Sequence, residues 1–110
     1  MDYSALAQQY FTAFERKDLE FLAGILHPDV VLTDWDQHVQ GREALLALNR
    51  GVFESLEKIV VNLRYLHVAG TTVIGEMELE LQPGAIRLKV VDVITFDEQG
   101  SIRSIRAYKG

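Results

Sequence analysis

The sequence contains no cysteine, which excludes disulfides, thiol nucleophiles and thiolate metal sites. It also has only two prolines and no apolar run of membrane-spanning length, and no basic amino-terminal segment precedes a signal-type core. We therefore expect a cytoplasmic protein. An excess of positive charge is lacking as well. The formal net charge of -5 argues against nucleic acid or an anionic membrane as a partner.

What the chain does contain is typical of a globular domain. Hydrophobic residues make up 48% of the sequence and charged residues 25%. A chain of 110 residues is long enough for one modest core, and no repeat or linker divides it. We expect a single domain over residues 1–110.

The first half of the chain has the periodicity of helices. In residues 3–16, one helical face collects apolar side chains at Tyr3, Leu6, Ala7, Tyr10 and Phe14. Asp18 can cap a second helix that runs to Leu26, where His27-Pro28 stops it. A short strand is expected over residues 30–35, and Gly41 and Arg42 open a third helix over residues 43–56.

The second half alternates between apolar and polar residues, as strands do. Four strands are expected over residues 59–68, 72–81, 86–96 and 102–108, with turns between them. Long antiparallel strands after three helices predict an α+β domain in which the helices cover one face of a curved sheet. The side chains expected to face the helices are Val73, Met77, Leu79, Leu88 and Val90. Gly75, among these large residues, predicts a bulge or an open space on the concave side.

The opposite face of the sheet also carries apolar residues. The same alternation places Val60, Leu66, Val68, Val91 and Val93 there. Because a soluble monomer rarely exposes such a stripe, this face predicts a homodimer.

Asp92 interrupts an apolar face. Between Ile86 and Phe96 the alternation puts it in register with Leu88 and Val90. A carboxylate among aliphatic side chains loses hydration, so it must find hydrogen bonds or take up a proton. A protonated acid can donate a hydrogen bond to a ligand, whereas the alternative is a structural aspartate bonded to a neighbouring loop.

Two further polar groups, Tyr10 and Asp34, fall on faces that are expected to be buried. Each has a structural explanation, as a core tyrosine or as a turn-forming aspartate. Together with Asp92 they offer what enolisation of a ketone requires, since a carboxylate takes the proton and two neutral donors stabilise the oxyanion. Asp36 lies on the same side as Asp34 if the strand continues, and it is then an alternative base.

Several segments resemble those of ketosteroid isomerases, within the nuclear-transport-factor-2-like superfamily that includes the SnoaL-like polyketide cyclases. They are Lys17-Asp18-Leu19-Glu20, His27-Pro28-Asp29-Val30, Thr33-Asp34, Gly41-Arg42-Glu43, Val91-Asp92-Val93-Ile94-Thr95-Phe96-Asp97-Glu98 and Arg106-Ala107-Tyr108. The resemblance covers nearly the whole chain. It implies a cone-shaped, cystatin-like α+β barrel, usually dimeric, in which a mostly antiparallel sheet wraps around three helices and encloses a deep apolar cavity. Within it, Asp34 matches the general base, and Tyr10 and Asp92 match the two oxyanion-hole donors.

The chain departs from the isomerase pattern at four positions. Trp35 follows the base where proline is usual, Asn49 and Leu26 stand where tyrosines are common, and Lys109 replaces an aromatic residue. We expect the ligand to be contacted by Phe14, Leu26, Trp35, Asn49, Phe53, Val73, Met77, Leu88, Val90 and Ile105.

The expected function is cofactor-free proton transfer on a small, neutral, apolar carbonyl compound. A metal site is not expected, because His27, His38 and His67 are scattered along the chain. Two alternatives stay open: a polyketide-cyclase-like aldol reaction, which needs the same acid–base groups, and a non-catalytic ligand-binding or dimerisation module.

Overall fold

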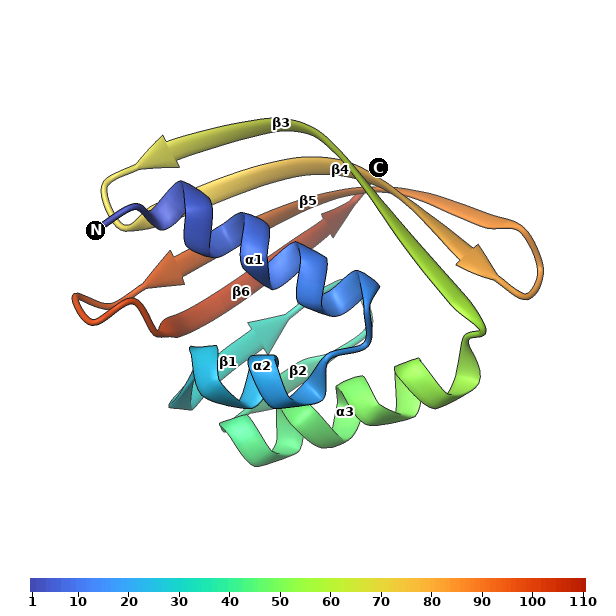
Figure 1. The fold of residues 1–110 in the computed structure, drawn as a ribbon, viewed down its shortest axis with the longest axis horizontal. Helices are drawn as coiled ribbons and strands as arrows, with labels where there is room; N and C mark the ends of the chain where they lie inside the picture. Colours follow the sequence, from blue (N-terminus) through green and yellow to red (C-terminus); the bar gives the residue numbers. More distant parts are fainter.

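A computed structural model describes all of residues 1–110 and consists of three helices and one six-stranded sheet (Figure 1). The helices are α1 (Tyr3–Glu15), α2 (Leu19–Ile25) and α3 (Arg42–Ser55). The strands are β1 (Leu26–Thr33), β2 (His38–Gln40), β3 (Lys58–Ala69), β4 (Thr72–Gln82), β5 (Ile86–Phe96) and β6 (Ile102–Lys109). No helix is both long and apolar enough to cross a membrane.

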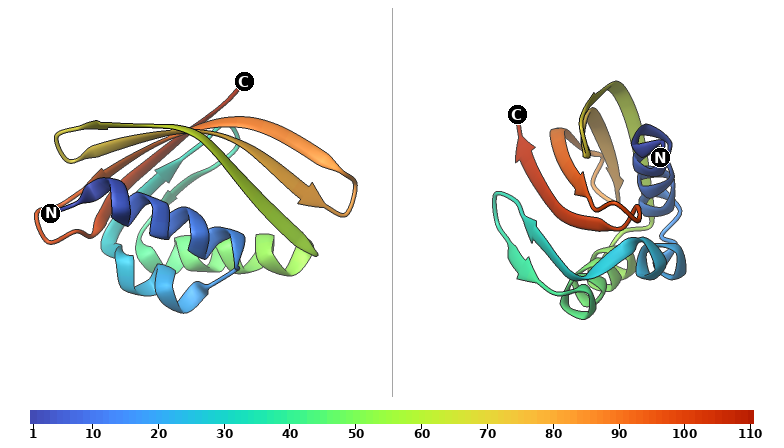
Figure 2. Two further views of the ribbon diagram at one scale, coloured as in Figure 1. Left: turned by 45° about the horizontal axis from the view of Figure 1, so that its top comes forward. Right: turned by 90° about the vertical axis from the view of Figure 1, so that its left-hand side faces the viewer.

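The sheet has the strand order β2-β1-β6-β5-β4-β3. Strands β1 and β6 pair in parallel, and every other pair is antiparallel. The sheet bends strongly and the helices lie on its concave side (Figure 2). The expected α+β fold is confirmed, although the sheet stays open because β2 and β3 form unpaired edges.

Two aspartates begin the first two helices. The Asp2 carboxylate accepts a hydrogen bond from the backbone N–H of Ala5 at 3.0 Å, and Asp18 accepts one from Phe21 at 3.0 Å. Each bond satisfies a backbone donor that has no partner within the helix. The predicted cap at Asp18 is thereby confirmed.

The region between α2 and α3 differs from the sequence-based prediction. Strand β1 begins at Leu26, which was expected to end the helix, and it continues through Pro28. Proline is tolerated there because the pairing of β1 with β6 shifts between Leu26 and Val31, where no ladder hydrogen bond is required from it. The strand ends at Thr33 rather than Trp35, and the three-residue strand β2 was not predicted.

The predicted register of β4 and β5 is confirmed. Val73, Met77 and Val90 are buried beneath the helices, and Leu79 and Leu88 pack against the same core while retaining partial exposure. The alternation of apolar residues therefore identified the concave face correctly.

A β-bulge at Arg64 reverses the faces of the second half of β3. Leu63 pairs with Met77 and Tyr65 with Glu76, so that Arg64 has no partner on β4. The extra residue turns Leu66 toward the core, opposite Gly75. It also places Val68 on the concave face, opposite Val73, although Val68 lies near the end of the strand and is 53% exposed. The prediction that Leu66 and Val68 lie on the outer face is therefore wrong, because strict alternation takes no account of a bulge.

Candidate active site

A small pocket opens between α1 and the concave face of the sheet. Its volume is about 90 Å³, and its walls come from α1, from the loop after β1 and from strands β3 to β6. The residues that line it are Tyr10, Phe11, Phe14, Trp35, Val61, Met77, Leu79, Val90, Asp92 and Ala107. Pockets that hold drug-sized ligands measure roughly 300–1,000 Å³. The pocket in this structure therefore suits a much smaller molecule.

Tyr10 reaches the pocket from the buried face of α1. Its side chain is only 6% exposed and packs edge-on against Phe11. Burial raises the pKa of the Tyr10 phenol, and the nearby charge of Asp92 raises it further. The phenol therefore stays protonated and available as a hydrogen-bond donor at any physiological pH.

Asp92 reaches the pocket from β5. Burial raises the pKa of its carboxyl to about 7, and the charge of Asp34 adds to this effect. The side chain takes part in none of the ion pairs of the protein. It retains some accessible surface, and it lines the pocket. A substantial fraction of Asp92 is thus a neutral acid near pH 7.

The hydroxyl of Tyr10 and the carboxyl of Asp92 make no hydrogen bond within the protein. No fully buried polar side-chain atom in the structure lacks a partner. Both groups must therefore open onto accessible space, and the space next to them is the pocket. Both groups therefore reach the pocket without a hydrogen-bond partner in the protein.

Asp34 lies in the loop that joins β1 to β2. One of its oxygens, Oδ1, accepts hydrogen bonds from the backbone N–H groups of Asp36 and Gln37, both at 2.7 Å. The turn-forming interpretation of Asp34 is correct, and the second oxygen, Oδ2, accepts no hydrogen bond from the protein. The Asp34 side chain does not itself line the pocket, yet its charge lies close enough to raise the pKa of Asp92. Asp36 is exposed, and of these two loop carboxylates only Asp34 affects the pKa of Asp92.

Of the ten residues expected to contact a ligand, four line the pocket: Phe14, Trp35, Met77 and Val90. Leu26, Val73 and Ile105 are packed inside the core, with exposures of 2%, 0% and 2%. Phe53 lies behind the wall, where its ring meets that of Phe14 at a centroid distance of 5.2 Å. Leu88 packs against the core beside the pocket.

Asn49, the last of the ten, is the one buried polar side chain outside the pocket wall. It is 6% exposed, and its amide makes no hydrogen bond within the protein. Since no fully buried polar atom lacks a partner, this amide also retains contact with accessible space.

Four lining residues were not predicted from the sequence: Phe11, Val61, Leu79 and Ala107. The signal for Phe11 was Gly75, because a Cβ on Gly75 would lie 2.8 Å from Cζ of the Phe11 ring. The space predicted at Gly75 exists, and this ring fills it. Ala107 could have been found from its spacing, since it is the Cα partner of Asp92 on β6.

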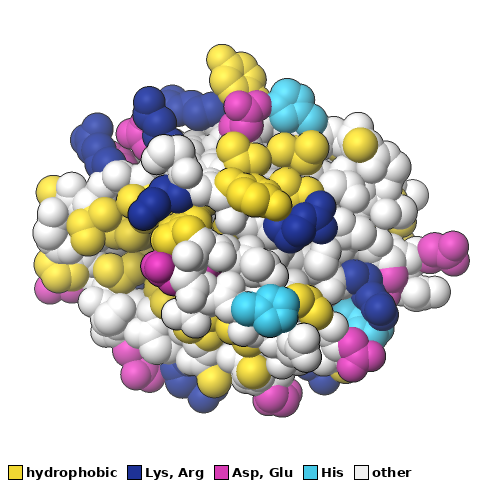
Figure 3. All heavy atoms as spheres, turned by 180° about the vertical axis from the view of Figure 1, so that it is seen from behind, with side chains coloured by type: hydrophobic (Ala, Val, Ile, Leu, Met, Phe, Trp, Pro, Cys, Tyr) yellow, Lys and Arg dark blue, Asp and Glu magenta, His cyan; other side chains and the backbone are white.

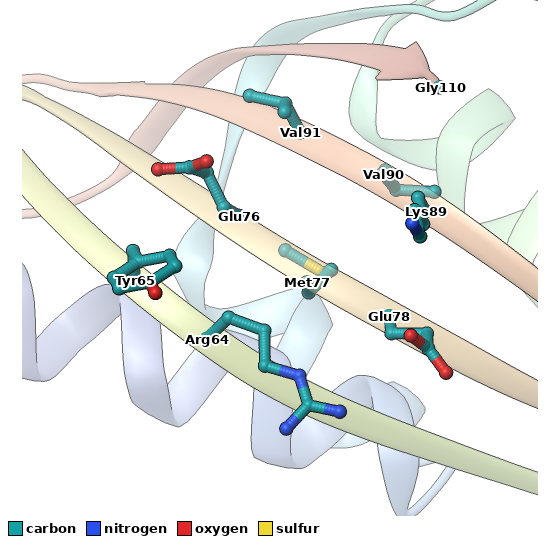
Figure 4. Close-up of a pocket in the computed structure, with 9 residues that line it drawn as sticks. All are labelled: Arg64, Tyr65, Glu76, Met77, Glu78, Lys89, Val90, Val91 and Gly110. Atoms are coloured by element: carbon teal, nitrogen blue, oxygen red, sulfur yellow. The ribbon is translucent and has the colours of Figure 1, made fainter.

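A larger hollow of about 310 Å³ lies on the opposite, convex face of the sheet (Figure 4). Charged side chains rise into it from β3, β4 and β5, among them Arg64, Glu78 and Lys89. None of the polar or charged side chains that line this hollow is buried. The candidate chemistry therefore belongs to the smaller, concave pocket.

The convex face also carries an apolar patch beside this hollow. Two rows of residues cross four strands, and their apolar members, here called the outer patch, are Tyr65, Ile74, Val91, Val93 and Tyr108. Tyr65 is 65% exposed and Tyr108 is 56% exposed. The back of the molecule shows hydrophobic side chains gathered together, with basic and histidine side chains around them (Figure 3).

The fold is shared with many solved structures. A protein from Shewanella denitrificans provisionally named a SnoaL-like polyketide cyclase has a TM-score of 0.89 at 19% identity, over 98% of this chain and 90% of that one. An epoxide hydrolase of M. tuberculosis gives 0.85 at 20% identity, over 98% and 82% of the two chains. A protein from Kribbella flavida provisionally named a ketosteroid isomerase gives 0.83 at 22% identity, over 98% and 77%.

These three structures carry names of different activities, so the shared fold does not by itself fix the chemistry. A comparison with curated proteins finds no match. The model of the SnoaL-like domain, in contrast, matches residues 7–105, which include the pocket donors Tyr10 and Asp92. The chain therefore belongs to the family of SnoaL-like domains.

Proposed function

We propose that the protein binds a small carbonyl compound with an apolar skeleton and catalyses proton transfer next to the carbonyl group. Enolisation and migration of a double bond are the reactions of this type. The observation that supports the proposal is the pairing of Asp92, an acid with a pKa of about 7, with the unpartnered Tyr10 phenol on an apolar wall. Titratable groups with strongly shifted pKa values concentrate at functional sites.

Tyr10 and Asp92 would bind the carbonyl oxygen of the ligand. Both groups are donors when protonated, and a neutral acid attracts a developing oxyanion where a carboxylate would repel it. The apolar surroundings strengthen these hydrogen bonds, because little water competes for them. Negative charge that forms on the oxygen during enolisation would thereby be stabilised.

Asp34 would take the proton from the carbon beside the carbonyl group and return it to the product. Its Oδ1 is held by the amides of Asp36 and Gln37, which fixes the carboxylate, while Oδ2 is free to act as the base. Base and oxyanion donors thus come from different elements of the fold, the loop on one side and α1 with β5 on the other.

A polyketide-cyclase-like aldol reaction is the second candidate. It uses the same base and oxyanion donors, and the family match and a structural neighbour from Shewanella denitrificans favour it. The pocket volume of about 90 Å³ favours a smaller substrate than a polyketide. The shape of the product separates the two reactions, because an aldol closes a ring and an isomerisation does not.

Conversion of 3-cyclohexen-1-one into its conjugated isomer tests the proposal. The reaction is followed by ultraviolet absorbance, and in deuterated water by mass spectrometry. We expect the wild-type protein to accelerate it and Tyr10→Phe to slow it about 10²–10³-fold, the usual effect of removing one oxyanion donor. Tyr3→Phe is the matched control, because the Tyr3 hydroxyl donates to the backbone of Asp97 and lines no part of the pocket.

If the wild-type protein binds the ketone without accelerating exchange, the catalytic proposal fails and a ligand-binding module remains. The same holds if Tyr10→Phe and Tyr3→Phe have equal rates. Titration of 4-propylphenol, whose oxygen stands in for the enolate oxygen, shows whether the pocket binds in either case.

A further inference from the structure

Lys109 occupies the inner face of β6 at the end of the pocket. Side chains alternate along a strand, so Ile105, Ala107 and Lys109 point to the same side. Ile105 is buried in the core and Ala107 lines the pocket. The Cα partner of Lys109 is Val90, which lines the pocket from β5. The backbone thus sets Lys109 directly beyond the pocket wall, on its concave side.

The ammonium group of Lys109 lies above a second pocket residue. Its Nζ is 5.4 Å from the centre of the Trp35 ring, within the range of a cation–π contact. Trp35 lines the pocket and is 40% exposed, so its ring forms the rim where pocket and solvent meet. The cation is therefore held at the mouth.

No carboxylate neutralises this cation. The ion pairs of the structure involve Arg42, His67 and Arg87, and none involves Lys109. Asp34 and Asp36, the acids of the loop that carries Trp35, do not pair with it. A net charge of -5 and two acids near the pocket would otherwise repel an anionic ligand. Lys109 is the charge at the rim that offsets this repulsion.

The spacing fits a ligand that has two polar ends. Ala107 is the Cα partner of Asp92, and Lys109 is the Cα partner of Val90. Along the strand direction, Lys109 is therefore two residues beyond Asp92, which is about 7 Å at the usual rise of a strand. A carbonyl oxygen bound by Asp92 and Tyr10 would leave the other end of a short ligand near the Lys109 ammonium.

We propose that Lys109 and Trp35 form a specificity subsite that receives a carboxylate, so that the substrate class is a small keto acid with an apolar middle. This inference rests on the proposed function, because it assumes that the carbonyl oxygen lies at Tyr10 and Asp92. The Trp35 ring covers the apolar middle, and the ammonium pairs with the anionic end. Lys109 acts as a positioning residue and takes no part in the proton transfer.

Calorimetric titration with two phenols tests the subsite. The phenol oxygen of 3-(4-hydroxyphenyl)propionate and of 4-propylphenol stands in for the enolate oxygen, and only the first probe carries a carboxylate. We expect Lys109→Met to weaken binding of the propionate roughly two- to fivefold, as for exposed ion pairs, and to leave 4-propylphenol unchanged. Lys109→Arg should retain the wild-type affinities, and high salt should erase the difference between wild type and Lys109→Met.

Lys58→Met is the matched control, because Lys58 is exposed at the start of β3 and the substitution removes the same charge. An equal loss for both probes in Lys109→Met would show that the lysine only packs on Trp35, and no loss for either would show that it faces solvent. Both results overturn the subsite.

The same titrations distinguish failure of the proposed function from failure of the subsite alone. If neither probe binds the wild-type protein, or if Tyr10→Phe binds both as well as wild type does, the oxyanion site itself is refuted and the subsite falls with it. If the phenols bind through Tyr10 and Lys109→Met changes nothing, only the subsite is refuted.

Discussion

The ring of Phe11 occupies the space that a side chain on Gly75 would need. A Cβ there would lie 2.8 Å from Cζ and 3.1 Å from Cε2 of the ring. Gly75 is also the Cα partner of Asp92, and Phe11 and Asp92 both line the pocket. Glycine at this position therefore lets an aromatic ring pack against β4, on the strand next to the acid.

Gly75→Ala should destabilise the protein by about 1–3 kcal/mol, because the new methyl group forces the Phe11 ring out of its position. Urea denaturation measures the change. Gly51→Ala is the control: this glycine lies in α3 with nothing within 4 Å of an added Cβ, and alanine there should stabilise the helix by about 0.5–1 kcal/mol.

A smaller residue in place of Phe11 should relieve the clash. The double variant Gly75→Ala, Phe11→Leu should therefore lose less stability than the sum of its two single variants, because the sites are in contact. If the losses of stability were strictly additive, the cost of Gly75→Ala would not come from contact with the Phe11 ring.

Asp92 should make the stability of the fold depend on pH. Its pKa is raised from 3.8 to about 7, so the folded state binds the proton more tightly than the unfolded chain. This contribution is fully present below about pH 4, decreases as the pH rises, and is lost above about pH 7. Each unit of difference in pKa corresponds to about 1.4 kcal/mol.

Urea unfolding of wild type and Asp92→Asn across this pH range isolates the effect. Asparagine cannot titrate, so the difference in unfolding free energy between the two proteins should change by a few kcal/mol in favour of Asp92→Asn as the pH rises. A difference that does not vary between about pH 4 and pH 7 would contradict the raised pKa.

Asp34→Asn should abolish proton exchange and leave the affinity for 4-propylphenol largely intact. The asparagine oxygen can still accept the hydrogen bonds from Asp36 and Gln37, so the loop keeps its conformation while the base is lost. Deuterium incorporation into the ketone measures the loss. Asp36→Asn, which removes an exposed carboxylate two residues away, should retain exchange. The reverse result would assign the base to Asp36.

Loss of an oxyanion donor should slow the reaction, whereas loss of the base should abolish it. Asp92→Ala should raise the activation free energy of the reaction by about 2.7–4 kcal/mol, the range for removal of one oxyanion donor, and so should lower turnover. Because Asp92 must be protonated to donate, wild-type turnover should also fall as the pH rises above about 7. A rate that stays constant from pH 6 to pH 9 would exclude Asp92 as a donor.

We expect the outer patch to form a homodimer interface, because Val91 and Tyr108 are neighbours on β5 and β6, and Tyr65 lies in the same row on β3, beyond Glu76. Sedimentation at micromolar concentration should give a dimer for the wild type and a monomer for Val91→Glu. Ala47→Glu introduces the same charge on the exposed face of α3 and should remain dimeric. A monomeric wild type would refute the interface.

Three helices and four long strands could be predicted from the sequence, because each carries a regular pattern of apolar residues. Asp18 and its capped helix, and the inward set from Val73 to Val90, were found in this way. Strand β2 could not be found, because His38, Val39 and Gln40 are too few to show a period.

The candidate site was predictable in part. Tyr10 and Asp92 stand out as polar residues on apolar faces, and the structure brings both to one pocket. The curvature of the sheet decides which apolar side chains form the pocket wall. Alternation in the sequence predicts the face of a strand on which a residue lies, but it does not predict this curvature. Leu26 and Ile105 share the inward side with the true wall and yet lie too deep to contact a ligand.

Arg64 gives the third strand an unusual tolerance to a change in chain length. In a regular strand, deletion of one residue sends every following side chain to the opposite face. Because Arg64 has no partner on β4, its deletion would leave Tyr65 opposite Glu76 and Leu66 opposite Gly75, so no side chain would change face. The strand would instead lose its local bend and straighten. A deletion at this one position can therefore change the curvature of the concave wall, while every other residue of β3 keeps its partner on β4.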